Sequence, residues 1–95
     1  MDYTDIDLFI ESHLDESIAE LSRLVRQPSI SAQDIGMAEC AEIVRSMLEK
    51  RGFSAQVFPT NGPPIIFGER KGTSEKTLLI YNHYDVQPPD PLELK

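Results

Sequence analysis

The hydrophobic period of this chain changes at Gly52, and that change indicates the fold class. Before Gly52, apolar residues recur every three to four positions, which is typical of amphipathic helices. After Gly52, apolar and polar residues alternate over residues 53–58, and short apolar runs follow at 65–67 and 77–81. Such alternation and short runs indicate strands. The sequence therefore predicts an α/β layer arrangement of two helices, a β-hairpin and a central strand.

Two helices are expected in the first half of the chain. The first spans about residues 4–26, with Thr4 as N-cap, Asp7 in the capping-box position and Pro28 ending the helix. The second spans about residues 33–51. Each helix carries one apolar face, formed by Ile6, Ile10, Leu14, Ile18, Leu21 and Val25 in the first and by Met37, Cys40, Ala41, Val44, Met47 and Leu48 in the second. Gly52 is expected as a left-handed C-cap of the second helix.

Three strands are expected after Gly52. Residues 53–58 and 65–69 flank a turn rich in proline and glycine, so they are predicted to pair as a hairpin. The apolar run at 77–81 is typical of a strand covered on both faces, and it is the candidate for the central strand. Three prolines between residues 88 and 91 prevent regular structure beyond it. Because a central strand needs neighbours on both sides, we expect an incomplete domain with an exposed, association-prone apolar edge.

Charge and cysteine content disfavour several classes of function. The formal net charge of −7 makes nucleic acid and anionic membranes poor partners. Residues 1–20 contain seven acidic and no basic residues, which we interpret as a solvated helix face, with a docking surface for a basic partner as the less favoured alternative. No apolar run is long enough to span a bilayer, and the N-terminal residues do not resemble a secretory signal. The single cysteine, Cys40, lies on an apolar helix face and is expected as a core residue.

His83 and Asp85 are the candidate site residues. They lie two positions apart at the end of the expected central strand, so both side chains should project from the same face. Active sites of α/β sheets form at the carboxyl ends of strands. Imidazole is a common zinc ligand, and a carboxylate commonly supports such a ligand from behind. Spacing alone leaves two interpretations open, a metal site or a local hydrogen-bonded pair, since a catalytic zinc needs about three protein ligands.

Other catalytic patterns find no support in the sequence. The chain has no glycine-rich phosphate loop. Ser29 and Ser31 follow a helix without a nucleophile-elbow pattern around them. Nucleotide binding and serine-nucleophile chemistry are therefore not expected.

Residues 78–88, which read Leu-Leu-Ile-Tyr-Asn-His-Tyr-Asp-Val-Gln-Pro, resemble the first metal-ligand signature of the M20 metallopeptidases, a family of dinuclear zinc peptidases and deacylases. The upstream chain agrees with this resemblance. An acidic first helix, the turn Pro28-Ser29-Ile30-Ser31, a second helix ending in Gly52-Phe53 and the stretch Gly62-Pro63-Pro64 occur in the family's order. The resemblance covers essentially the whole chain, and residues 86–94 look most like the dipeptidase branch. Asn82 stands where many members have glycine.

The resemblance implies a role for each candidate residue. His83 resembles the ligand of one of two zinc ions, and Asp85 resembles the catalytic-site carboxylate that supports the metal from behind. The implied activity is metal-dependent hydrolysis of dipeptides or related amide bonds by a cytoplasmic enzyme that takes small peptides and forms a homodimer. The remaining ligands, the general base and a smaller lid domain come from parts of the family that these 95 residues do not contain. We therefore expect residues 1–95 to be the N-terminal part of the catalytic domain, inactive alone and a weak zinc binder.

Two alternatives remain open at this point. One is an amidohydrolase that acts on N-acyl amino acids. The other is a small acidic α/β interaction module in which the site is degenerate. An interaction module has no need for His83, Asp85 and three prolines at a strand end, so the sequence favours the enzyme.

Overall fold

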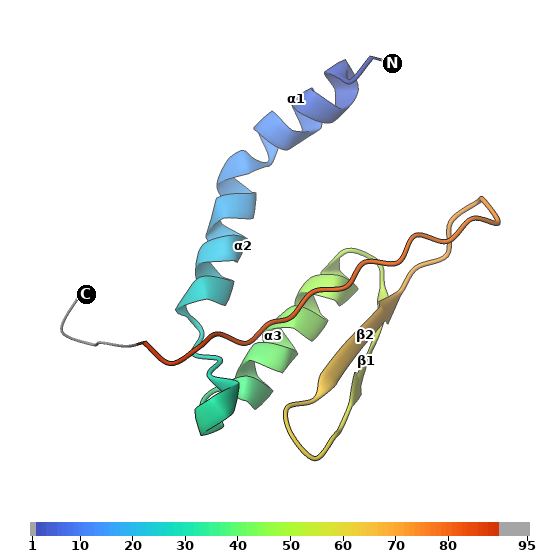
Figure 1. Ribbon diagram of the computed structural model, residues 1–95. Coiled ribbons are helices and arrows are strands. Elements are labelled where there is room, and N and C mark those ends of the chain that lie inside the picture. Colours follow the sequence, from blue (N-terminus) through green and yellow to red (C-terminus); the bar gives the residue numbers. More distant parts are fainter. Residues whose placement is uncertain (1, 90–95) are drawn as a thin grey trace.

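The computed structural model describes residues 2–89 and shows a mixed α/β arrangement (Figure 1). The elements, in chain order, are α1 (Thr4–Ser12), α2 (Leu14–Arg26), the short 3₁₀ turn η1 (Ser31–Gln33), α3 (Met37–Lys50), β1 (Ser54–Phe58) and β2 (Ile65–Glu69). The predicted α/β class is confirmed. Residues 90–95, which include the end of the proline-rich stretch, lie outside the described part of the chain.

The expected hairpin is present and packs against α3. β1 and β2 pair antiparallel, with Phe58 opposite Ile65 next to the turn. Both strands contact α3. At Gly68 an added Cβ would lie 3.0 Å from a methyl carbon of Leu48, so glycine allows β2 to approach the helix closely. The hairpin and α3 together form one packed unit, the α3–hairpin unit.

α3 begins later than the sequence indicated. We expected a start near residue 33, but the helix begins at Met37. Asp34 and Gly36 have left-handed backbone with φ of 50° and 70°, and a right-handed helix cannot continue through such residues. The predicted end is confirmed, since Gly52 has a φ of 84° directly after the last turn.

The fully buried core lies in the N-terminal half of α3. Met37, Cys40 and Ala41 are at most 3% exposed, whereas Met47 and Leu48, expected on the same face, are half-buried. Burial raises the pKa of the Cys40 thiol, because the apolar surroundings disfavour the thiolate. The prediction that Cys40 is a core residue is confirmed.

The first predicted helix is interrupted at His13, which separates α1 from α2. The side chains of Ser12 and His13 both hydrogen bond to the carbonyl oxygen of Phe9, at 3.0 and 2.8 Å. The His13 amide shares its bond between the Phe9 and Ile10 carbonyls, each at 3.2 Å, which tightens the chain at the break. The predicted cap is also wrong. Thr4 lies inside α1, and Asp2 accepts hydrogen bonds from the Thr4 amide at 2.9 Å and from its hydroxyl. Aspartate is at least as good a partner for these free amides as threonine.

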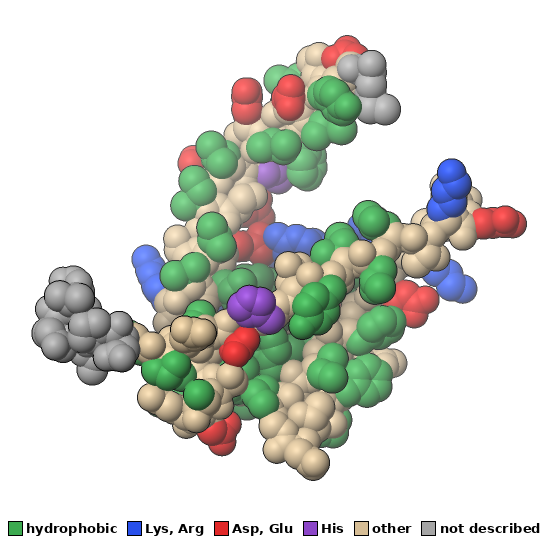
Figure 2. Space-filling view, in the orientation of Figure 1, with side chains coloured by type: hydrophobic (Ala, Val, Ile, Leu, Met, Phe, Trp, Pro, Cys, Tyr) green, Lys and Arg blue, Asp and Glu red, His purple; other side chains and the backbone are tan. Residues whose placement is uncertain are grey.

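α1 and α2 form an arm that leaves the α3–hairpin unit (Figure 1). The apolar stripe of the arm is exposed rather than buried, and Figure 2 shows hydrophobic side chains along its length. The radius of gyration is 16.4 Å, against roughly 12 Å for a compact domain of this length. Within the described residues, none of the helices has both the length and the apolar character of a membrane span.

Ion pairs join α2 to the end of α3. Glu20 accepts a hydrogen bond from Arg51 at 2.8 Å, and Lys50 lies 3.2 Å from Glu16 and 3.6 Å from Glu20. Two of the acidic residues predicted for the solvated face, Glu16 and Glu20, therefore pair with basic residues of the same chain.

The expected central strand is not formed. Residues 77–81 pair with no described strand, and the sheet contains only β1 and β2 among residues 2–89. An extended segment becomes a strand only when a neighbour supplies hydrogen bonds to its backbone. The apolar side chains of the run are exposed, as predicted for an unpartnered edge: Leu78 and Leu79 at 84%, Ile80 at 73% and Tyr81 at 86%.

Candidate active site

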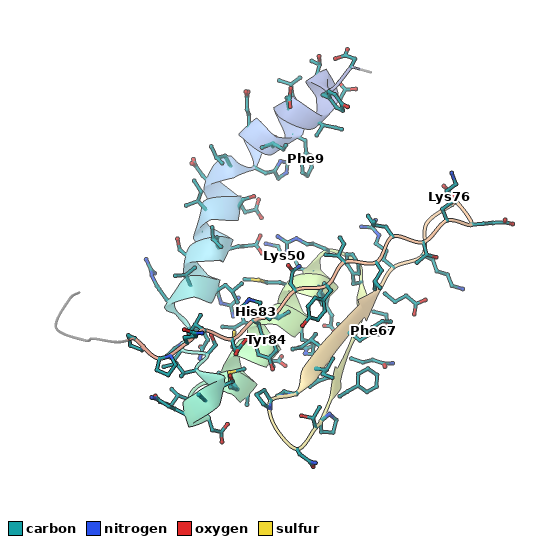
Figure 3. The ribbon with its side chains drawn as sticks, in the orientation of Figure 1. Phe9, Lys50, Phe67, Lys76, His83 and Tyr84 are labelled. Carbon is teal, nitrogen blue, oxygen red and sulfur yellow. The ribbon has the colours of Figure 1, made fainter. Side chains whose placement is uncertain are left out.

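The candidate site lies on residues 80–86, a segment that crosses α3 rather than ending a strand (Figures 1 and 3). Several hydrogen bonds hold this segment to distant parts of the chain, and two of them anchor it to backbone carbonyls. The Val86 amide donates to the carbonyl of Ser29 at 2.8 Å, and the Tyr84 hydroxyl donates to the carbonyl of Pro64 at 2.6 Å. The loop after α2 and the turn before β2 therefore position the site.

His83 and Asp85 lie side by side, as their spacing predicted. The Nδ1 atom of His83 is 3.1 Å from Oδ1 of Asp85 and 3.1 Å from the Asp85 backbone oxygen. Both partners are acceptors, so the geometry favours a proton on Nδ1 and leaves Nε2 as the ring nitrogen that neither atom of Asp85 contacts. The His83 side chain is 77% exposed, which leaves Nε2 accessible to a ligand.

Asp85 is held on its other oxygen by Ser31. The Ser31 hydroxyl donates to Oδ2 of Asp85 at 2.7 Å, across a separation of 54 residues in the sequence. This hydrogen bond, followed by the contact with His83, holds the pKa of the Asp85 carboxyl below its usual range. Asp85 is therefore ionised at neutral pH and accepts from both neighbours.

His83 and Asp85 open onto a groove with mainly apolar walls. Leu24 of α2, Val44 of α3 and Ile66 of β2 contribute to these walls. Figure 2 shows the histidine of this face beside an acidic side chain, with hydrophobic side chains next to both. An apolar groove with a few polar groups at one end suits a small ligand that has both apolar and polar parts.

The donor set fits one side of a metal site. His83 can offer Nε2 as a ligand, with Asp85 behind it on Nδ1. Within residues 2–89, no group of three or more His, Cys, Asp or Glu side chains could hold a metal ion. A catalytic zinc needs about three protein ligands. The described residues therefore fit part of a metal site and not a complete one.

Sequence reasoning missed Ser31 and Tyr84. From the sequence, a serine after a helix suggests at most a nucleophile, whereas Ser31 acts here as a donor to the Asp85 carboxylate, 54 residues along the chain. No local signal points to such a contact. The proline at position 28 and the left-handed residues that follow show only that the chain turns there.

Comparison with known proteins identifies relatives over most of this chain. No protein-family model matches. The chain is 38% identical over 96 residues to the Cys-Gly metallodipeptidase dug1 of Schizosaccharomyces pombe, and the match covers 83% of this chain and 20% of that protein. It is 43% identical to the M20 family metallo-carboxypeptidase Sso-CP2 of Sulfolobus solfataricus, with a TM-score of 0.70 over 79% of this chain and 18% of the other. The chain thus spans about one fifth of the proteins it matches. Sequence and structure together show that most of this chain is similar to one part of the M20 family metallo-carboxypeptidase and of the metallodipeptidase.

Proposed function

We propose that this chain contributes a metal ligand to an enzyme that hydrolyses dipeptides or closely related amide bonds. The observation that carries the proposal is the His83–Asp85 pair, with Nδ1 held by the carboxylate and Nε2 accessible. The 38% sequence identity between this chain and a Cys-Gly metallodipeptidase supports peptide hydrolysis as the reaction. It also supports small peptides as the substrate class.

In this proposal, His83 binds a metal ion through Nε2. Asp85 holds the proton on Nδ1, keeps the ring in one orientation and raises its basicity as a ligand. Zinc is the expected metal, with two ions in the complete site. A bound metal ion of this kind polarises a scissile carbonyl and lowers the pKa of a water molecule.

The described residues supply one ligand, so we expect the 95-residue chain alone to bind zinc weakly and to hydrolyse nothing. The complete enzyme is proposed to be a cytoplasmic homodimer. Its further ligands and its general base would come from sequence beyond the matched fifth of the relatives.

The test is a dipeptidase assay on the protein as its natural source produces it, with the intact mass measured in parallel. Zinc-dependent cleavage of Cys-Gly, lost on chelation and lost in His83→Ala, is the expected result. His13→Ala is the matched control, because His13 lies in the arm and contacts Phe9. Cleavage that survives either chelation or His83→Ala would contradict the proposal.

An amidohydrolase acting on N-acyl amino acids is the second candidate. The apolar walls of the groove, with Leu24, Val44 and Ile66, could accept an acyl chain. The same assay with N-acetyl amino acids separates the two, because faster hydrolysis of the acyl substrates would favour this candidate.

A further inference from the structure

We propose that Ser31 is a positioning residue for the ring of His83. Its hydroxyl holds the Asp85 carboxylate, and that carboxylate in turn holds the proton of His83 on Nδ1. The inference rests on the proposed role of His83 as a metal ligand, but its test needs neither metal nor substrate.

The two oxygens of Asp85 have separate partners. Oδ2 accepts from the Ser31 hydroxyl at 2.7 Å, and Oδ1 lies 3.1 Å from Nδ1 of His83. A carboxylate bound at both oxygens cannot rotate freely about its terminal bond. The His83 side chain is 77% exposed and that of Asp85 is 42% exposed, so packing alone restrains them weakly. The Ser31 hydrogen bond therefore sets the orientation of the carboxylate.

Ser31 is itself held in a tightly closed loop. The Ile30 amide donates to the carbonyl of Ile35 at 2.9 Å, and the Ile35 amide donates back to Ile30 at 3.1 Å. At Gly36 an added Cβ would lie 2.0 Å from the backbone oxygen of Pro28, so the loop folds directly back on its own start. A donor on such a loop is well fixed, which a positioning group requires.

The loop is also fastened to the site segment next to Asp85. The Val86 amide donates to the Ser29 carbonyl at 2.8 Å, and Ile30 forms an isolated parallel bridge with Val86. Ser31 therefore faces Asp85 as a consequence of backbone pairing and not of a chance side-chain contact.

The expected effect follows from imidazole chemistry. A neutral imidazole can carry its proton on either nitrogen, and only the form with the proton on Nδ1 offers Nε2 as a ligand. If that form is only partly populated, the apparent affinity for a ligand at Nε2 falls by the same fraction. By fixing Asp85, Ser31 raises the share of His83 that is ready to bind.

The test is the tautomer ratio of His83, read from the ¹⁵N shifts of its ring at a pH high enough that these shifts no longer change with pH. In the 95-residue chain we expect the Nδ1–H form to dominate. In Ser31→Ala the ratio of the Nδ1–H to the Nε2–H form should fall roughly three- to ten-fold, the net effect of losing one typical hydrogen bond. Ser31→Thr keeps the hydroxyl and should restore the ratio.

Two controls report on indirect effects. His13 is the internal reference, because its Nδ1 lies 2.8 Å from the Phe9 carbonyl in the arm and should not respond to Ser31. Ser46→Ala is the matched variant. It removes a serine hydroxyl that bonds to the Ile43 carbonyl within α3 at 2.8 Å, and the His83 ratio should not change.

An unchanged His83 ratio in a folded Ser31→Ala chain would overturn the proposal. So would a failure of Ser31→Thr to restore the ratio. If Ser31→Ala does not fold, Ser31→Cys replaces the hydroxyl by a thiol of similar size that is a weaker donor. The ratio of the Nδ1–H to the Nε2–H form of His83 should then also fall, and an unchanged ratio would overturn the proposal. The measurement reports only where the proton of His83 lies. A negative result would therefore overturn the role of Ser31 without contradicting peptide hydrolysis, and a negative dipeptidase assay would not contradict a shifted tautomer ratio.

Discussion

The hydroxyl of Tyr84 donates a hydrogen bond of 2.6 Å to the backbone oxygen of Pro64. Tyr84 lies between the two candidate site residues, and Pro64 directly precedes β2. This bond therefore ties the site segment to the hairpin. Burial raises the pKa of the Tyr84 hydroxyl, so it remains a donor throughout the neutral range.

Removing that hydroxyl should destabilise the fold modestly. We expect Tyr84→Phe to lower the free energy of unfolding by about 1 kcal/mol, the net contribution of one hydrogen bond. Urea denaturation followed by circular dichroism measures the change. Tyr81→Phe is the matched control, since Tyr81 is 86% exposed, and it should shift stability by less than about 0.5 kcal/mol. Equal effects of the two substitutions would argue against the Tyr84 anchor.

Gly36 should tolerate no side chain. Its φ is 70°, and an added Cβ would lie 2.0 Å from the Pro28 oxygen. We expect Gly36→Ala to cost at least about 2 kcal/mol of stability, from backbone strain together with this clash. The midpoint of urea unfolding checks this. Gly72→Ala provides the contrast, because nothing lies within 4 Å of that position and stability should be nearly unchanged. A stable Gly36→Ala chain would show that the loop can open without loss.

The Cys40 thiol should be nearly inert in the folded chain. It is 1% exposed, and burial raises its pKa, so both access and thiolate content are low. We expect alkylation at pH 8 to be more than about ten-fold slower in buffer than in concentrated urea, where the thiol behaves as a free cysteine. Mass spectrometry of the labelled chain gives both rates. Similar rates would mean that the core around Cys40 opens readily.

The ion pairs between α2 and α3 should give stability a definite pH dependence. Arg51, through its hydrogen bond, holds the pKa of Glu20 below the value of 4.5 that is usual for glutamate. A lowered folded-state pKa stabilises the fold above the unfolded-state pKa, and this contribution is lost as the pH falls through the folded-state pKa. Unfolding midpoints measured from pH 7 downward should therefore decline in acid for the parent chain.

Glu20→Gln should show a weaker decline over the same pH range, because the group that titrates is absent. Glu11→Gln serves as the control and should follow the parent chain. Added salt should reduce the difference between the parent and Glu20→Gln, since these charges are partly exposed. Parallel pH profiles for the parent and Glu20→Gln would contradict the assignment.

The exposed run at residues 77–81 should make the chain associate with itself. Leu78 and Leu79 are each 84% exposed, and no described strand covers their backbone. We expect sizing chromatography to show concentration-dependent oligomers. Leu79→Lys should shift the population toward monomer, whereas Ser74→Lys, in the polar turn before the run, should not. A parent chain that remains monomeric at high concentration would contradict this expectation.

The parts of the fold that sequence reasoning predicted depend on local signals. The hairpin follows from alternation around a proline- and glycine-rich turn, and the end of α3 follows from Gly52. The buried position of Cys40 follows from its place on one helix face. Each of these features is decided by residues close together in the chain.

The features that the sequence did not predict depend on contacts between residues far apart in the chain, or on side-chain hydrogen bonds that the apolar pattern does not show. The break at His13 coincides with hydrogen bonds from the Ser12 and His13 side chains to the Phe9 carbonyl, which the apolar period does not reveal. The run at 77–81 has the composition of a strand, but composition cannot supply a neighbour. For the site, the spacing of His83 and Asp85 predicted their pairing. The Ser31 hydroxyl that binds Asp85 lies 54 residues away in the sequence, and no residue near Asp85 indicates that contact.

The link between Ser29 and Val86 has a consequence for how the molecule fluctuates. Closing a stretch of chain this long costs configurational entropy, and few buried apolar contacts accompany the closure. The α3–hairpin unit, in contrast, is held by contacts between segments adjacent in sequence. We therefore expect the segment that carries His83 to detach more readily than α3 and the hairpin unfold, so that hydrogen exchange at the Val86 amide would report local opening of the site.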